Sequence, residues 1–234
     1  MDFPGGDTAR ITGPDALHIR RSLRMQPGEE LVLCDGRGTD YACEIAGFDG
    51  EDVLLSVLSH APTSSEPSVA VTLYQGLPKG DKMDWIIQKA VELGVTAIVP
   101  VATARSIVKV EGKEEKKRER WQRIAAEAAG QCGRGIIPSV SAPLPWKEAL
   151  ARLTDAPAVV FYEGGGTPLR RLTGPETTTL SIVVGPEGGF APEEIAALQA
   201  VGVDIATLGP RILRCETAPL AALSAIMLLT GNMD

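Results

Sequence analysis

The sequence Leu180-Ser-Ile-Val-Val-Gly-Pro-Glu-Gly-Gly-Phe190 joins a short apolar run to a turn rich in glycine. A second apolar run ends in a similar turn, Leu208-Gly-Pro-Arg-Ile-Leu-Arg-Cys-Glu-Thr-Ala218. Short apolar runs that stop at glycine and proline are typical of buried strands. In α/β proteins, the loops that follow such strands form the ligand crevice at one edge of the sheet. The two segments therefore predict an α/β fold whose binding site exposes bare backbone.

The same alternation of strands and helices extends outward from these loops. Apolar runs predict strands at residues 69–73, 96–100, 158–162, 180–184 and 203–208. Helical patterns occupy residues 81–94, 114–131 and 192–200, and a last apolar helix starts at Thr217. Asp81 is positioned to cap the first of these helices. Strands that alternate with helices predict a largely parallel sheet covered by helices.

Residues 10–60 follow a different pattern. Short apolar runs are separated there by the turn signals Asp35-Gly36 and Asp49-Gly50, which predicts a small β-barrel. The segment Ala61-Pro-Thr-Ser-Ser-Glu-Pro-Ser68 has the composition of a linker. We therefore expect two domains, residues 1–66 and 69–234.

The composition excludes several classes of protein. With 234 residues, 44% hydrophobic and 23% charged, the chain is typical of a soluble globular protein. Its net charge of −7 argues against a generic polyanion binder, but residues 79–134 hold 12 Lys and Arg against 8 Asp and Glu. This basic tract is either a face that meets RNA phosphates or a solvated helix of mixed charge.

The cysteines and the apolar segments exclude further classes. Four isolated cysteines and two histidines have no zinc-ligand spacing, so we expect no metal site. Residues 1–6 lack the pattern of a signal peptide, and the apolar run 218–229 is too short to span a bilayer. We therefore expect a cytoplasmic protein without a membrane partner.

The first loop has two interpretations. Its glycines are either simple turn residues or positions where backbone groups reach a planar base. The chain has neither the P-loop nor the G-x-G-x-x-G pattern after this strand, and Glu187 would repel phosphate. These features favour a nucleoside that carries no phosphate, and S-adenosylmethionine, with its positive sulfonium, is such a molecule.

The second loop contains charged residues just before an apolar helix. Glu216 and Thr217 can cap the helix, and Arg211 or Arg214 can form a surface ion pair with Glu216 or Glu187. Alternatively, an arginine beside a ligand loop can bind phosphate or polarise a carbonyl. We expect at least one of the two arginines to be functional.

With these two loops, the chain resembles the ribosomal RNA small subunit methyltransferase E family. Residues 75–95 and 117–134 resemble the family's first helix and its basic helix. The resemblance implies a SPOUT-class enzyme that uses S-adenosylmethionine to methylate N3 of a uridine in 16S ribosomal RNA. It also implies an N-terminal PUA-like barrel and a C-terminal parallel sheet with a trefoil knot. A homodimer packed through the helix from Thr217 is a further expectation.

Three groups of site residues follow. For catalysis we expect Arg214 or Arg211 to stabilise charge on the uracil carbonyls and Glu216 to orient the arginine, with Glu187 as a less favoured general base. The expected cofactor contacts are Tyr162, Glu163, Val184, Gly185, Pro186, Glu187, Gly188, Leu208, Gly209, Ile212, Leu213 and Ala218. The expected RNA contacts are Arg20, Arg21, Arg24, Lys79, Arg105, Lys116, Lys117, Arg120, Arg123 and Arg134.

Two other functions remain open from the sequence. The first is a SPOUT methyltransferase that acts on another atom of RNA, such as a ribose 2′-hydroxyl. The second is a non-catalytic RNA-binding factor in ribosome assembly. The substrate is either free 16S ribosomal RNA or the assembled small subunit.

Overall fold

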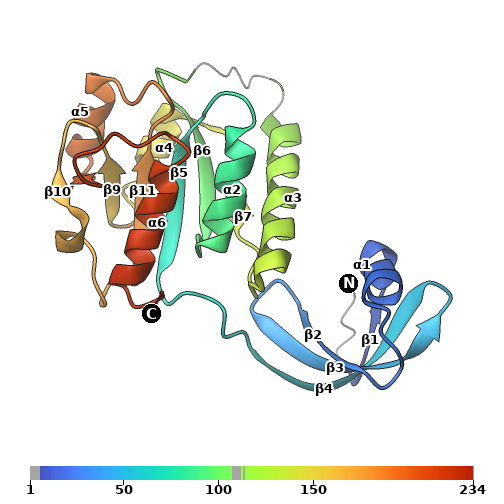
Figure 1. Ribbon diagram of the computed structural model, residues 1–234. Helices are drawn as coiled ribbons and strands as arrows, with labels where there is room; N and C mark the ends of the chain where they lie inside the picture. The colour runs from blue at the N-terminus through green and yellow to red at the C-terminus, as the bar shows by residue number, and fades with distance from the viewer. Residues whose placement is uncertain (1–5, 107–111, 113, 234) are drawn as a thin grey trace. The chain divides into compact units, whose positions relative to one another are not determined.

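The computed structural model describes residues 6–106, 112 and 114–233 (Figure 1). The chain forms two compact units. The first contains the residues up to Glu66 together with the short segment Gly133–Ile136, and the second contains Pro67–Cys132 and the chain from Ile137 onward. No helix of the described residues is both long and apolar enough to cross a membrane.

The first unit is built on an antiparallel sheet of four strands in the order β1-β4-β3-β2. A short helix and a π-helical turn follow β1, where the sequence suggested only strands. Ile11, Ala16, Ile45 and Leu55 are among the residues of its separate apolar core. The elements are β1 (Thr8–Ile11), α1 (Gly13–Leu17), η1 (His18–Leu23), β2 (Glu30–Cys34), β3 (Thr39–Asp49) and β4 (Asp52–Pro62).

Arg134 fixes the returning segment to the first unit. Its guanidinium pairs with Glu66, and its side chain is only 5% exposed. The backbone N–H of Ile136 donates to the same carboxylate at 3.0 Å, and Gly38 N–H donates to the Gly135 carbonyl at 2.8 Å. The prediction that Arg134 contacts RNA does not fit this arrangement, because the charge is buried and paired.

We expect Arg134→Met to lower the free energy of unfolding by about 3 kcal/mol, because it leaves a buried carboxylate without its partner. Urea denaturation measures the loss. The control is Arg118→Met, since the ion pair of Arg118 with Glu115 is exposed and contributes less than about 1 kcal/mol. Equal losses in the two variants would contradict a structural role for Arg134.

The second unit contains a parallel sheet of eight strands. Its strand order is β10-β12-β9-β11-β5-β6-β7, and β8 also pairs with β6. The alternation of strands and helices predicted from the sequence is confirmed. The strands are β5 (Ala70–Gly76), β6 (Ala97–Ala102), β7 (Ser139–Val140), β8 (Leu144–Pro145), β9 (Ala158–Phe161), β10 (Thr167–Pro168), β11 (Thr179–Val184) and β12 (Asp204–Thr207).

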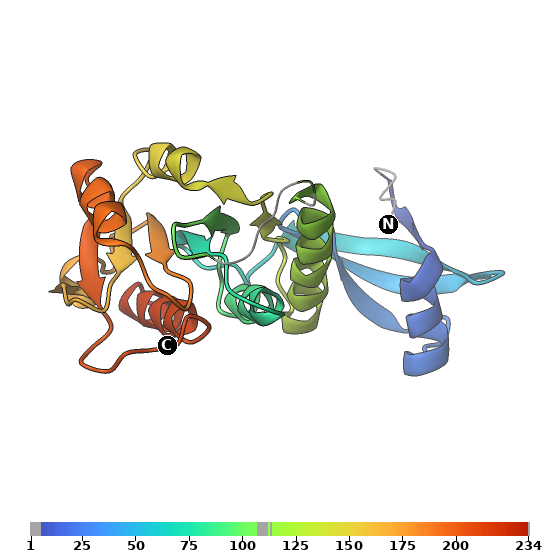
Figure 2. The ribbon, with the colours of Figure 1, turned by 90° about the horizontal axis from the view of Figure 1, so that it is seen from above.

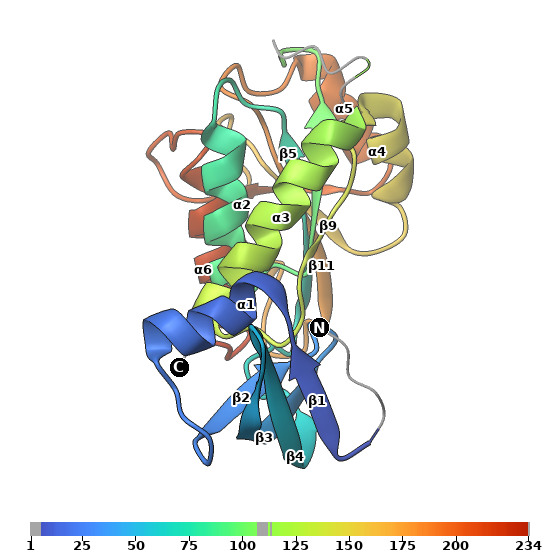
Figure 3. The ribbon, with the colours of Figure 1, turned by 90° about the vertical axis from the view of Figure 1, so that its right-hand side faces the viewer.

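Helices cover both faces of this sheet. Helices α2, α3 and α6 lie in a row on one face, and α4 and α5 lie on the other (Figures 2 and 3). The helical elements are α2 (Lys82–Glu92), α3 (Glu114–Cys132), α4 (Trp146–Arg152), η2 (Leu169–Arg171), α5 (Pro192–Ala200) and α6 (Ala218–Leu229). Asp81 precedes α2 as predicted, but its side chain makes no capping hydrogen bond.

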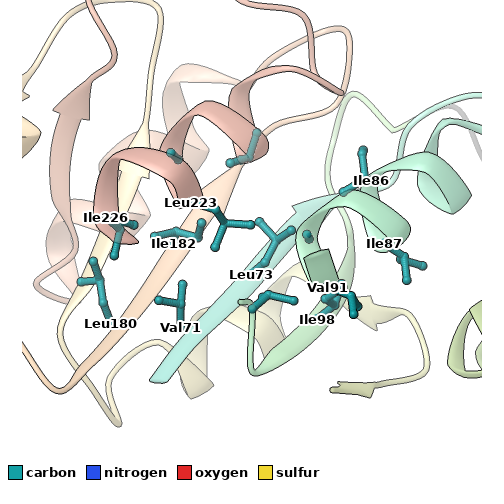
Figure 4. Close-up of a cluster of buried hydrophobic side chains, with 14 of the residues drawn as sticks. Val71, Leu73, Ile86, Ile87, Val91, Ile98, Leu180, Ile182, Leu223 and Ile226 are labelled. Atoms are coloured by element: carbon teal, nitrogen blue, oxygen red, sulfur yellow. The ribbon is translucent and has the colours of Figure 1, made fainter. Parts of the chain in front are cut away.

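The central strands β9 and β11 do not alternate between apolar and polar residues, because both of their faces are buried. On β11, Leu180 and Ile182 face the core under α6 and α2, where Leu73 and Leu223 also pack (Figure 4). The next residue, Val183, faces the second core, under α4 and α5. This double burial holds β11 on both faces, so the loop that follows it starts from a fixed point.

The trefoil knot that the resemblance implies stays a prediction.

Candidate cofactor site

Three adjacent strands end together at one edge of the second unit. Val184 of β11 is in register with Phe161 of β9, which is paired in turn with Ala206 of β12. The loops that follow these strands enclose a cavity of about 940 Å³. The loops after β11 and β12 are those that the sequence singled out, so the crevice lies at the predicted strand ends.

Every residue predicted for the cofactor or for catalysis lines this cavity. From β9 and its loop come Tyr162 and Glu163. The loop after β11 contributes Val184, Gly185, Pro186, Glu187 and Gly188, and the loop after β12 contributes Leu208, Gly209, Arg211, Ile212, Leu213, Arg214, Glu216 and Ala218. The structure therefore brings the whole set together; their roles remain to be tested.

The sequence did not identify several residues of the wall. Most of them lie within or next to the predicted loops. Gly164 and Gly165 belong to a further run of glycines, which is a turn signal visible in the sequence. No sequence signal indicated Lys82, because it lies in the first turn of α2, far from the cofactor loops in the sequence. The unpredicted lining residues are Lys82, Phe161, Gly164, Gly165, Gly189, Phe190, Thr207, Pro210 and Cys215.

Lys82 forms an ion pair with each of the two loops. Its Nζ lies 3.0 Å from Glu187 Oε1 and 3.2 Å from Glu216 Oε2. The Cys215 thiol donates to Glu216 Oε2 at 3.2 Å. The hypothesis that Glu216 orients an arginine therefore does not match this structure, because its carboxylate is bonded to Lys82 and to Cys215 instead.

The ionisation of these groups follows from their contacts. Burial alone would raise the pKa of Glu187, but hydrogen bonds from its own backbone amide and from Lys82 outweigh burial and lower that pKa. The Cys215 thiol is the main cause of the lowered pKa of Glu216. Bonds to Glu187 and Glu216 raise the pKa of Lys82. Burial and the bond to Glu216 raise the pKa of Cys215 to about 12, so this thiol is neutral.

These shifts predict how stability depends on pH. A carboxyl with a lowered pKa stabilises the fold above its unfolded pKa, and the contribution disappears as the pH falls through the folded pKa. The raised pKa of Lys82 places loss of its contribution above about pH 10. We therefore expect wild type to melt at a higher temperature than Glu187→Gln between about pH 5 and pH 10. The difference should begin to shrink below about pH 4, near the unfolded pKa of a glutamate, and disappear as the pH falls through the lowered folded pKa of Glu187. Thermal unfolding of both proteins from neutral to acidic pH measures it, and a difference that does not shrink as the pH falls would contradict the role of Glu187.

Arg211 and Arg214 are exposed at the mouth of the cavity. Neither side chain makes an ion pair or hydrogen bond within the described residues, whereas Lys82 is paired with Glu187 and Glu216. The backbone carbonyl of Arg214 accepts bonds from Thr217 N–H at 2.8 Å and Ala218 N–H at 2.9 Å. Arg214 is thereby fixed to the start of α6, and its guanidinium remains available to a second ligand.

The basic residues predicted to contact RNA are distributed over both units. In the first unit, the Arg20 guanidinium bonds the Gly50 carbonyl and lies 4.9 Å from the centre of the Phe48 ring. Arg21 pairs with Glu51 at 3.0 Å, and both side chains are exposed. Arg24 is exposed with a φ of 56°. These three residues share the turn η1 and the residue after it.

In the second unit, most of the predicted basic residues lie on α3. Lys116, Arg120 and Arg123 are exposed, and Lys117 lies partly over the Trp121 ring. Arg120 pairs with Asp84 of α2. Lys79 and Arg105 lie beside the cofactor loop instead: Lys79 N–H donates to Glu187 Oε1 at 3.1 Å, and Arg105 donates to the Gly188 carbonyl at 2.8 Å.

Within the described ranges, no group of three or more His, Cys, Asp or Glu side chains is placed to hold a metal ion. Three charged groups of the cavity, Lys82, Glu187 and Glu216, are instead paired with one another.

Comparison with known proteins identifies the family. Residues 65–227 match the RNA methyltransferase domain family, and residues 11–58 match the RNA methyltransferase PUA domain family. Ribosomal RNA small subunit methyltransferase E of Bacillus subtilis is 40% identical over 228 residues, covering 94% of this chain and 89% of the relative. The Mycobacterium bovis protein of that name is 33% identical, covering 98% and 89%.

A solved structure agrees with these relatives. The ribosomal RNA small subunit methyltransferase E of Neisseria gonorrhoeae, bound to S-adenosyl methionine, superposes with a TM-score of 0.86 at 33% identity. The match covers 98% of this chain and 94% of that one. The similarity therefore includes both units, the parallel sheet and the loops that enclose the cavity. The chain belongs to the ribosomal RNA small subunit methyltransferase E family.

Proposed function

We propose that this protein transfers a methyl group from S-adenosylmethionine to N3 of a specific uridine in 16S ribosomal RNA. The observation that supports it most strongly is the meeting of the two glycine-containing loops and two unpaired arginines around one cavity. One part of the site can hold a nucleoside, and the other can meet a base that gains negative charge.

The cavity fits S-adenosylmethionine in size and chemistry. Its volume lies in the range of pockets that enclose ligands of this size. Gly209 has a φ of 102° and open space where a Cβ would project, so its backbone can approach a bound ring. Phe161 and Leu208 supply apolar walls, and Glu187 disfavours a phosphate. When bound, the cofactor would supply the activated methyl group.

The residues around the cavity favour activation of uracil by a cation. Uracil N3 is a poor nucleophile while protonated, so its proton must pass to a base or to water, and a cation can stabilise the negative charge that then appears on O2 and O4. The nitrogen would take the methyl group, and S-adenosylhomocysteine would leave. Glu187 is a poor candidate for the base, because its pKa is lowered and its negative charge is paired with Lys82. The thiol of Cys215 is held protonated. The backbone of Arg214 is fixed, and its guanidinium has no partner among the described residues. Arg214 is therefore the candidate for the cation that stabilises the charge on O2 and O4.

Mass spectrometry of the product tests the proposal. Purified protein is incubated with labelled S-adenosylmethionine and either naked 16S ribosomal RNA or small subunits, and the RNA is then digested to nucleosides. We expect labelled N3-methyluridine at a single position. Labelled 2′-O-methyl nucleoside would support the alternative SPOUT chemistry. Absence of both product and cofactor binding would support a non-catalytic RNA-binding factor.

The proposal includes an RNA surface and a second copy of the chain. RNA would contact the exposed basic residues of η1 in the first unit and those of α3 in the second, and its binding should weaken steeply with added salt. Helix α6 would form the dimer contact, because it is an apolar helix and one of its large apolar residues, Leu228, is 60% exposed. Light scattering coupled to gel filtration measures the oligomeric state, and a monomer at all concentrations would contradict it.

A further inference from the structure

We propose that Lys82 is a positioning residue that holds the two cofactor loops at their working separation. The proposal rests on the function above, because it assumes that these loops bind S-adenosylmethionine. Lys82 is bonded to Glu187 in one loop and to Glu216 in the other. Among the described residues, no other side chain forms an ion pair with both loops. A single ammonium group thus joins the two loops at this cavity.

The electrostatics of the cluster require a cation at this point. The oxygens of Glu187 and Glu216 that contact Lys82 lie no more than about 6 Å apart, since both contact the same nitrogen. Lowered pKa values keep both carboxylates ionised. The remaining titratable group that faces Lys82 is the Cys215 thiol, 3.9 Å from Nζ, and it is neutral. Without Lys82, two negative charges would repel each other across the cavity.

Lys82 starts from a rigid position. It is the first residue of α2, and the next residue, Met83, is 2% exposed in the main core. Asp84 connects the same turn to α3, because it accepts from Trp121 Nε1 at 3.1 Å and pairs with Arg120. A group that positions others must itself be held by packing and hydrogen bonds, and Lys82 satisfies this condition.

A direct contact with the cofactor is the rival role for Lys82. The side chain is 34% exposed and lines the cavity, so its ammonium could also meet the carboxylate of the cofactor's methionine part. The two roles differ in what they predict for a ligand without that carboxylate. A positioning role weakens every ligand that needs both loops. A direct contact weakens only ligands that carry the carboxylate.

The test uses Lys82→Met, with Lys82→Arg as the conservative variant and Lys89→Met as the matched control. Lys89 lies on the same helix and pairs with Glu92 at 2.7 Å, but it does not line the cavity. Calorimetry measures the dissociation constants for S-adenosylmethionine and for methylthioadenosine, which lacks the amino-acid part. Hydrogen exchange of residues 185–190 and 208–217 is measured without ligand.

We expect Lys82→Met to weaken both ligands by a similar factor, roughly 10- to 100-fold, the value of a hydrogen bond to a charged group. Exchange in both loops should become faster, Lys82→Arg should recover most of the affinity, and Lys89→Met should match wild type. A loss confined to S-adenosylmethionine, or unchanged exchange in Lys82→Met, would overturn the proposal. Failure of wild type to bind either ligand would instead overturn the proposed function, while the exchange result still decides the role of Lys82.

Discussion

Replacing Arg214 by alanine is expected to lower kcat by roughly 10²- to 10³-fold, the usual cost of removing a group that stabilises charge in the transition state. The dissociation constant for S-adenosylmethionine should stay within about threefold of wild type, since an interaction made only in the transition state does not affect ground-state binding. Arg214 is the better candidate because the first turn before α6 holds its backbone, and its guanidinium has no partner among the described residues.

Single-turnover kinetics on 16S ribosomal RNA and calorimetry with the cofactor separate these two effects. Arg211→Ala is the first comparison, since Arg211 lines the same mouth but lacks the backbone anchor of Arg214. Arg170→Ala is the control for lost surface charge, because Arg170 is exposed on η2 and does not line the cavity. A loss of cofactor affinity equal to the loss of kcat would contradict the assignment, and a large loss in Arg211→Ala alone would transfer the role to Arg211.

The cofactor loops could be predicted from the sequence because their information is local. Each loop follows a segment that the sequence predicts as a strand, and parallel strands bring their carboxyl ends to one edge of the sheet. The partners inside the site were not predictable in the same way. Lys82 reaches Glu216 from a helix that lies far away in the chain, so no spacing indicates the contact. Glu216 was consequently assigned to an arginine two or five residues away, although Lys82 is its partner.

The fold likewise has elements that the sequence predicts and elements that it does not. The bounds of α5 match the predicted residues 192–200, because Pro192 and the acidic first turn mark its start. The strands β7, β8 and β10 contain only two residues each, which is too short for any periodicity. Arg134 was grouped with the basic tract because composition counts charge and does not register burial. Its pairing with Glu66 appears only when the segment Gly133–Ile136 returns to the first unit.

Gly76→Ala is expected to cause the largest combined loss of stability and cofactor affinity. Gly76 is buried at the end of β5, where the chain passes against the first cofactor loop. An added Cβ would lie 2.6 Å from Pro186 Cδ and 2.7 Å from Pro186 N. Neither a ring nor a backbone atom can move away cheaply, so overpacking should cost about 1–3 kcal/mol of the free energy of unfolding.

The same clash should displace the loop that carries Pro186 and Glu187, and we expect the dissociation constant for S-adenosylmethionine to rise at least about tenfold, equivalent to a further 1.4 kcal/mol. The matched control is Gly130→Ala inside α3, where a Cβ meets nothing within 4 Å. That change should stabilise the protein by about 0.5–1 kcal/mol and leave cofactor binding unchanged. Urea denaturation and calorimetry measure both variants. If Gly76→Ala bound the cofactor like wild type, the end of β5 would not shape the loop, and the close contact with Pro186 would serve packing alone.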